Sequence, residues 1–167
     1  LVLSGIMKDD FDVNLIDANT LQLSNKETLD KIKKINPIGI VFAFGNSVKN
    51  DDYEFVKELR KKLPKAKLCG TGGLLYHNAE NELINNHEFD ACLLNFTTND
   101  IIKYFNDDFH DIANIVYRDK KNKIVRTLNK DHDKPFSFSI PMHEKLPLEK
   151  YQISHGRSKP LTTVLTA

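Results

Sequence analysis

The stretch Ile38-Gly39-Ile40-Val41-Phe42-Ala43-Phe44 decides the fold class of this chain. It carries no charged or polar side chain, which is typical of a strand that is buried on both faces of a parallel sheet. A strand with one face in water would alternate apolar and polar residues instead. The stretch therefore predicts an interior strand with helices packed on both sides.

The segments around this strand alternate between helices and strands. Ser24 and Glu27 have the spacing of a capping box and begin a helix that ends at Asn36, before Pro37. Apolar residues at helical spacing predict a second helix from about 51 to 63. The other expected elements are strands over 12–17, 65–69 and 89–96, helices around 79–86 and 97–105, and a hairpin formed by 115–117 and 124–125. This order predicts an α/β fold whose parallel sheet is followed by an antiparallel hairpin.

The composition restricts the class of protein. The 167 residues suit one domain, and the 40% of hydrophobic residues supply enough apolar material for a core. The 24 Lys and Arg residues balance 23 Asp and Glu residues, so the chain has no basic excess that would favour nucleic acid. No apolar run approaches the roughly 18–20 residues of a membrane span, and no secretory signal is present, which predicts a cytoplasmic protein. Cys69 and Cys92 are expected to be buried, reduced thiols.

Prolines indicate a change of structure near Lys130. Four of the six prolines follow this residue, with scattered aromatic residues and histidines between them. Proline removes a backbone donor and disfavours both helix and sheet. We therefore expect a folded domain over 1–130 and an extended linker over 131–167.

Two glycine-rich segments are candidates for a ligand site. Gly45-Asn46-Ser47 and Gly70-Thr71-Gly72-Gly73 each follow a predicted strand, and parallel sheets bind ligands where their strands end. Neither segment matches the dinucleotide fingerprint or the phosphate-binding loop, so nucleotide hydrolysis has no support. The same glycines also suit tight turns without a ligand, and both interpretations stay open. If the second loop binds a ligand, Gly72→Val is expected to abolish binding with little loss of folding.

The sequence offers no group of catalytic or metal-binding residues. The six histidines share no metal-ligand spacing and are expected at the surface. The aspartate pairs at 9–10, 51–52 and 107–108 suit helix ends and turns better than they suit metal or phosphoryl chemistry. No nucleophile stands with a base in a recognisable pattern. The residues therefore predict a binding edge without a visible catalyst.

The order of the segments resembles the cobalamin-binding domains that precede radical S-adenosylmethionine domains. The similarity lies in residues 12–18, the helix that leads through Asn36-Pro37 to an apolar strand, the Gly72-Gly73 loop, the Phe89-Asp90 strand, and 115–119 with the Lys-Ile-Val that follows. Residues 146–151 are similar to the linker of that family, and 161–167 are similar to the first barrel strand of its radical domain. The resemblance implies a Rossmann-like, flavodoxin-like parallel sheet with helices on both faces.

The resemblance also implies a function and a site. The parent protein would be a methyltransferase or oxidative cyclase that uses cobalamin, S-adenosylmethionine and a [4Fe-4S] cluster. This chain lacks the cluster cysteines, so it would be a cobalamin carrier whose partner is the C-terminal radical domain. In the family, the cobalamin tail lies along the carboxyl edge of the sheet. The residues of that edge here are Gly45, Asn46, Ser47, Gly70, Thr71, Gly72, Gly73, Leu74, Asn95, Phe96 and Thr97.

Three features depart from the pattern of that family. The opening strand of the family would precede Leu1 and lie between the strands over 12–17 and 38–44, so the sheet is expected to lack it, and the open edge would favour self-association. Asn95-Phe96-Thr97-Thr98 stands where the family commonly has Gly-Glu-Gly-Glu, and Phe96 is expected to occupy space that the cofactor would use. The chain also has no Asp-x-His-x-x-Gly sequence, which argues against the cobalamin-dependent mutases.

Two other interpretations stay open. A non-catalytic α/β module would keep the fold and serve as a scaffold or interaction domain that no longer binds cobalamin. A receiver-like signalling domain is disfavoured, because Phe44-Gly45 offers no acidic residue to accept phosphate where its strand ends.

Overall fold

The computed structural model of the chain describes residues 1–45, 49–130 and 139–151. In these residues one sheet has its strands in the order β1 (Gly39–Ala43), β2 (Lys67–Thr71), β3 (Ala91–Leu93), β4 (Ile115–Arg118) and β5 (Ile124–Arg126). The first three strands pair in parallel, whereas β4 and β5 join as an antiparallel hairpin. The predicted fold class and the predicted hairpin are therefore confirmed.

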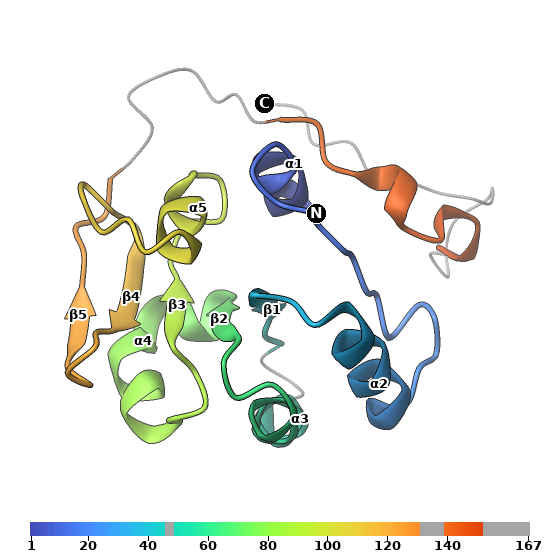
Figure 1. Cartoon of the computed structure of the whole chain (residues 1–167), viewed down its shortest axis with the longest axis horizontal. Helices are drawn as coiled ribbons and strands as arrows, with labels where there is room; N and C mark the ends of the chain where they lie inside the picture. The colour runs from blue at the N-terminus through green and yellow to red at the C-terminus, as the bar shows by residue number, and fades with distance from the viewer. Residues whose placement is uncertain (46–48, 131–138, 152–167) are drawn as a thin grey trace.

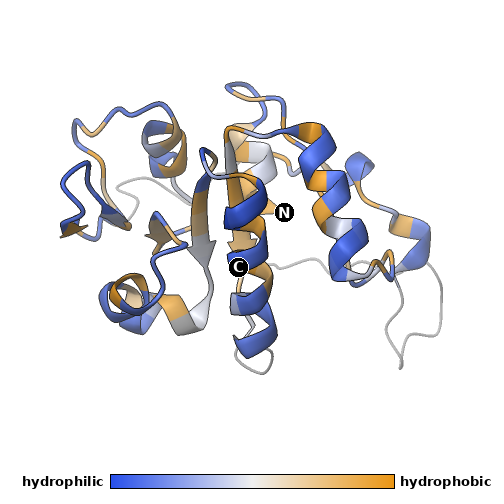
Figure 2. Cartoon of the chain, turned by 60° about the horizontal axis from the view of Figure 1, so that its bottom comes forward, coloured by the Kyte–Doolittle hydropathy of each residue, from blue (hydrophilic) through white to orange (hydrophobic). Residues whose placement is uncertain are grey.

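Helices cover both faces of the sheet (Figure 1). One face carries α2 (Asn25–Ile35), α3 (Lys49–Lys62) and α4 (Gly73–Asn85), and the opposite face carries α1 (Val2–Met7) and α5 (Asp100–Phe105). Figure 2 shows polar and apolar residues mixed along these helices, as expected for elements with one face on a core and one in water. The arrangement is the three-layer order of a Rossmann-like domain.

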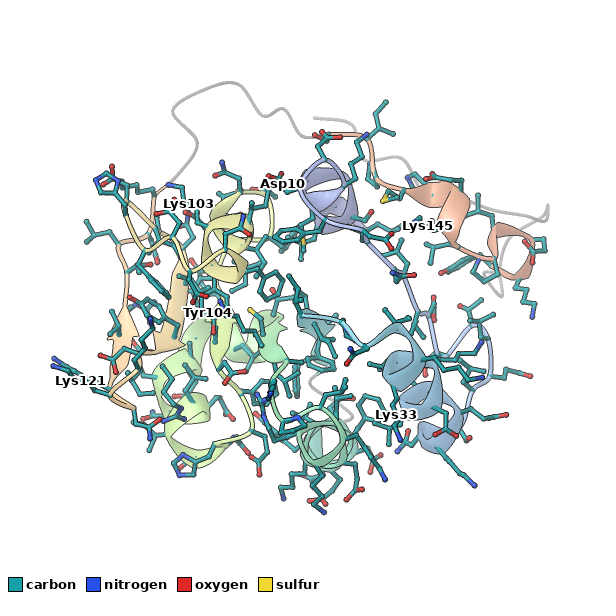
Figure 3. The ribbon with its side chains drawn as sticks, in the orientation of Figure 1. Asp10, Lys33, Lys103, Tyr104, Lys121 and Lys145 are labelled. Carbon is teal, nitrogen blue, oxygen red and sulfur yellow. The ribbon has the colours of Figure 1, made fainter. Side chains whose placement is uncertain are left out.

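Each face of the sheet has its own hydrophobic core. The core under α2, α3 and α4 includes Leu59, Leu68 and Phe89. The core under α1 and α5 includes Cys69 and Tyr104, and in Figure 3 the Tyr104 side chain points into the layer between α5 and the sheet. Neighbouring residues of a strand point to opposite faces, which is why Leu68 and Cys69 belong to different cores.

Both ends of α2 form where the sequence predicts them. The Ser24 hydroxyl accepts a hydrogen bond from the Glu27 amide at 3.3 Å, and the Glu27 carboxylate accepts one from the Ser24 amide at 2.9 Å. Asn36 ends the helix in the left-handed conformation, with φ of 49°. These contacts are local, so a short stretch of sequence is enough to specify them.

Several predicted element bounds were wrong. Residues 12–17 form no strand, and the described structure places no strand beside them that could share hydrogen bonds. β3 is limited to three residues that pair on both sides, rather than the whole of 89–96. α4 begins at Gly73 and is kinked at Asn78, so the expected helix around 79–86 corresponds to its second part, and the first part, where Leu75 packs in the core, was missed. α5 begins at Asp100 rather than at residue 97, and the side chain of Asn99 ahead of it makes no capping hydrogen bond.

Residues 139–151 lie against the N-terminal part of the chain. They contain two short 3-10 turns, η2 (His143–Lys145) and η3 (Leu148–Lys150). The Met142 amide donates to the Ser4 hydroxyl at 2.9 Å, and Lys145 Nζ donates to the Val13 carbonyl at 2.5 Å, as the position of Lys145 in Figure 3 illustrates. The other residues of the predicted linker, 131–138 and 152–167, lie outside the described residues.

Candidate functional site

The loops that follow β1 and β2 meet at the carboxyl edge of the sheet. The Phe44 amide donates to the Thr71 carbonyl at 2.8 Å, which extends the pairing of the two strands by one residue. The Gly45 amide donates to the Asp52 carboxylate at 3.2 Å, and Asp52 lies in the first turn of α3. The Asp51-Asp52 pair therefore stands at a helix start, as predicted.

Gly72 is required by the backbone at this edge. Its φ is +132°, and a Cβ at this position would lie 2.7 Å from the Phe44 carbonyl oxygen. A branched side chain would thus clash with fixed backbone and would also hold an unfavourable conformation. The prediction that Gly72→Val leaves folding intact is wrong, because this glycine joins the two loops whether or not a ligand binds.

Gly73, unlike Gly72, has free space where a side chain would stand. It is the first residue of α4, and a Cβ added to it would meet no atom within 4 Å. The Gly72 carbonyl already accepts hydrogen bonds from the Leu75 and Tyr76 amides, so the helix start is formed by the backbone itself. Gly73 is consequently the position where an added side chain would probe the edge without disturbing the fold.

The loop after β3 holds an aromatic side chain in water. The Asn95 carboxamide oxygen accepts hydrogen bonds from the Thr97 amide at 2.9 Å and the Thr97 hydroxyl at 2.7 Å. This Asx turn fixes the loop between β3 and α5. Phe96, at the tip, is 51% exposed. An exposed phenyl ring on a fixed turn is a contact that a ligand at this edge would meet or would have to displace.

Of the remaining predicted site residues, two have structural roles in the sheet and the others are only partly described or not described. Gly70 lies inside β2, and a Cβ there would lie 2.4 Å from the Leu75 side chain, so its small size serves core packing. The Thr71 hydroxyl is used within the sheet, where it donates to the Leu93 carbonyl at 3.1 Å. Leu74 belongs to the first turn of α4, but its side chain is not described. Asn46 and Ser47 lie outside the described residues.

A buried polar pair lies behind the edge, and sequence reasoning missed it. The Tyr53 hydroxyl donates to the Glu82 carboxylate, and the Tyr53 ring packs 5.3 Å from Phe44 and 6.0 Å from Phe89 between centroids. Burial, together with the hydrogen bond to Glu82, raises the pKa of Tyr53. The signal was available, because Glu82 follows Ala79 at helical spacing on the apolar face of α4.

The described residues contain no evident catalytic or metal-binding group. They hold no cluster of three or more His, Cys, Asp or Glu side chains that could bind a metal ion. Cys69 and Cys92 are free and buried as predicted, and burial raises the pKa of the Cys92 thiol to about 12, so it is not a ready nucleophile. Within the described part of the chain, no helix is long and apolar enough to cross a membrane.

Comparison with known proteins identifies relatives of the fold. No protein-family model and no curated protein matches the chain. Among solved structures, the cobalamin-dependent S-adenosylmethionine radical enzyme OxsB, with aqua-cobalamin and S-adenosylmethionine bound, is 13% identical with a TM-score of 0.66; the match covers 78% of this chain and 19% of that enzyme. The radical S-adenosylmethionine methyltransferase TsrM from Kitasatospora setae, with cobalamin and a [4Fe-4S] cluster bound, is 12% identical with a TM-score of 0.62 over 93% of this chain and 32% of TsrM.

These similarities concern the fold, since the sequence identities are low. The chain spans about a fifth of the length of OxsB and about a third of that of TsrM. Both are larger chains that bind cobalamin, and the resemblance in the order of segments led to the same class of enzymes. The chain therefore has the Rossmann-like fold found within cobalamin-dependent radical S-adenosylmethionine enzymes.

Proposed function

We propose that this chain is a cobalamin-binding domain of a larger radical S-adenosylmethionine protein. The observation that carries the proposal is the similarity of fold to two enzymes that were solved with cobalamin bound, at TM-scores of 0.66 and 0.62. The independent resemblance in the order of sequence segments supports the same class. The domain would occupy residues 1–130, and 131–167 would lead toward the radical domain of the parent.

The proposed site is the carboxyl edge of β1, β2 and β3. The residues there fit a large ligand at one position in particular, because a side chain at Gly73 would enter open space. Gly45 and the Asn95–Thr97 turn flank this position on the neighbouring strands. Parallel sheets bind ligands in the crevices outside these strand ends, which is the general reason to prefer this edge.

The chain would bind and orient the cofactor rather than catalyse a reaction alone. Cobalamin, when bound, supplies a cobalt ion that can carry a methyl group or an electron. The described residues offer neither a metal-binding cluster nor an activated thiol, so their contribution is to hold the cofactor and to exclude water from one side of it. S-adenosylmethionine and the [4Fe-4S] cluster would be bound by the radical domain of the parent.

A titration with hydroxocobalamin and methylcobalamin, followed by visible absorption, tests the proposal. We expect saturable binding by the native polypeptide and its loss in Gly73→Val, because a branched side chain would enter the open space at the edge. Asn85→Val is the matched control, since Asn85 is exposed at the opposite end of the same helix and its replacement should leave the affinity unchanged. Phe96→Gly is expected to tighten binding if the ring occupies cofactor space.

The outcomes separate the proposal from its alternative. Equal affinity of Gly73→Val and Asn85→Val would remove the glycine edge from the site. No saturable binding by a chain that is folded by circular dichroism, and none after extension toward the N-terminus, would overturn the proposal. That result would favour a scaffold or interaction module that no longer binds cobalamin.

A further inference from the structure

Residues 139–151, here called the strap, lie on the outside of the N-terminal segment (Figure 1). They follow the hairpin in the sequence, but they contact α1 and residues 12–17, which precede the whole sheet. The two short turns of the strap, η2 and η3, contain no buried residue, and none of residues 139–151 belongs to either core. Its attachment therefore depends on contacts other than core packing.

Gly5 forms the seat of the strap. It is buried within α1, and a Cβ added to it would lie 2.4 Å from the Ser139 carbonyl oxygen and 2.7 Å from the Ile140 carbonyl oxygen. Both oxygens belong to the backbone, so no side-chain rotation would relieve the clash. Glycine within a helix is less favourable than alanine. The close approach of the strap backbone is a physical reason for glycine at this position.

The first polar anchor of the strap lies beside this seat. The Met142 amide donates a hydrogen bond to the Ser4 hydroxyl at 2.9 Å, and that hydroxyl donates to the Leu1 carbonyl at 2.7 Å. Ser4 is buried in α1, so its hydroxyl joins the strap to the helix away from water. Because amide exchange can be followed for single residues, the Met142 amide reports whether the strap is seated.

Two further anchors lie farther along the strap. Lys145 Nζ is 2.5 Å from the Val13 carbonyl oxygen and 3.7 Å from the Asp12 carboxylate. The Tyr151 hydroxyl donates to the Asp17 carboxylate at 2.5 Å. The strap thus follows residues 13–17 in the same direction along the chain. Lys145 and Asp12 are exposed, and an ion pair in water contributes little stability.

The segment beneath the strap has no backbone pairing with the sheet. None of residues 1–23 lies in a strand of the described structure. Partly buried apolar side chains attach the segment instead, with Leu3, Met7 and Phe11 on one core and Ile16 on the other. The strap therefore supports from outside a segment that the strands do not hold.

We propose that the strap is a conformational latch, which opens as one unit and frees the N-terminal segment while the sheet stays folded. The contacts differ in kind, because the sheet has fully buried strands, whereas the strap has one seat and three polar anchors. Opening free energies within one protein range from near zero to that of global unfolding, and regions with few buried contacts have the low values. The proposal does not depend on cobalamin.

Native-state hydrogen exchange by NMR tests whether the strap opens without the sheet. The Met142 amide should be protected, yet it should exchange at least about 100-fold faster than the amide of Cys69 at the centre of β2. Low concentrations of urea should change the Met142 rate much less than the Cys69 rate, because a local opening exposes less surface than global unfolding.

Gly5→Ala tests the seat. The added methyl group would meet the backbone of residues 139 and 140, so the Met142 amide should exchange at least about 10-fold faster. The Phe11 amide, which donates to the Met7 carbonyl, should also exchange faster, and the Cys69 amide should not. Alanine favours the helix, so a poorer helix would not explain this result. Lys8→Ala is the matched control, since Lys8 is exposed at the end of α1.

The double variant Lys145→Ala/Tyr151→Phe tests whether the strap acts as one unit. It removes the two anchors that lie away from Met142, so faster exchange of the Met142 amide would show that the anchors open together. Glu149→Ala is the control, since Glu149 is an exposed residue of the same strap and its replacement should leave the Met142 rate unchanged.

Four results would overturn the proposal. A Met142 amide as slow as that of Cys69, with the same response to urea, would mean that the strap opens only in global unfolding. An unprotected Met142 amide, or one that Gly5→Ala leaves unchanged, would mean that the strap is not seated on α1. A Met142 rate unaffected by the double variant would mean separate anchors. An unchanged Phe11 rate in Gly5→Ala would mean that the strap does not hold the N-terminal segment. None of these readouts involves a cofactor, so they are distinct from a failure of cobalamin binding.

Discussion

β1 and β2 are adjacent parallel strands of five residues each. β1 is the more apolar of the two, yet β2 is the more buried. β1 reads Gly-Ile-Val-Phe-Ala and contains no fully buried residue. β2 reads Lys-Leu-Cys-Gly-Thr and has its three central residues buried, with Leu68 and Cys69 at 0% exposure. Among the described residues, β2 has a strand on each side, whereas β1 has a strand on one side only. Burial of a strand therefore depends on its neighbours as much as on its own side chains.

The substitution expected to destabilise the chain most lies at the centre of the sheet. Leu68→Ala should lower the free energy of unfolding by about 3 kcal/mol, because it removes a fully buried side chain from the core under α3 and α4 and leaves a cavity. Urea denaturation followed by circular dichroism measures this change. A loss below about 1 kcal/mol would mean that β2 is not the centre of the cooperative core.

A somewhat smaller loss of stability is expected from a substitution near the start of β4. The buried Asp100 carboxylate accepts hydrogen bonds from the Ala113 amide at 2.9 Å, the Asn114 side chain at 3.1 Å and the Thr98 hydroxyl at 2.6 Å. Asp100→Ala would leave these donors without their acceptor, at a cost of about 2 kcal/mol in the same denaturation experiment. Asp108→Ala is the control, since Asp108 is exposed just after α5. Equal effects of the two variants would contradict the structural role of Asp100.

At the free edge the effect of a similar truncation should be small. Ile40 is half-buried, so Ile40→Ala should lower the free energy of unfolding of the 167-residue chain by about 1 kcal/mol. Urea denaturation of this variant and of Leu68→Ala under the same conditions measures the difference between the two strands. Equal losses in the two variants would contradict the difference in burial between β1 and β2.

The smallest effect concerns the contact between residues 139–151 and the N-terminal segment. Burial raises the pKa of the Asp17 carboxyl, but hydrogen bonds from the Thr20 amide, the Tyr151 hydroxyl and the Thr20 hydroxyl outweigh it and hold the pKa below its ordinary value of 3.8. A lowered acid pKa gives stability that is present above the ordinary value and is lost as the pH falls through the pKa of the folded state.

Tyr151→Phe should therefore raise the pKa of Asp17 and cost roughly 0.5 kcal/mol near neutral pH. The difference between variant and native chain should shrink as the pH falls below the ordinary pKa of 3.8. An NMR titration of the Asp17 carboxyl and urea denaturation at two pH values measure these changes. An unchanged Asp17 pKa in the variant would show that the Tyr151 contact does not form in solution.

Sequence reasoning was most accurate where the determining contacts are local. The capping box of Ser24 and Glu27 and the stop at Asn36 involve neighbours in the chain, so α2 was predicted almost to the residue. The hairpin of β4 and β5 followed from an apolar pattern, and the burial of the two free cysteines followed from their small number and wide separation. The strand over 12–17 was predicted wrongly by the same kind of reasoning, because a strand also needs a partner, and pattern alone does not show whether one is present.

The candidate site at the carboxyl edge of the sheet likewise has some features that local sequence predicts and others that depend on distant parts of the chain. By itself, the sequence determined that glycines follow β2 and that Phe96 follows β3, at the edge where α/β sheets commonly bind ligands. Only the tertiary structure decided that Gly70 serves packing, that Gly72 is required by the Phe44 carbonyl, and that Gly73 faces open space. It also decided that the apolar β1 stands at an edge. The physical reason is that these roles depend on atoms brought together from distant parts of the chain, whereas the sequence records only neighbours.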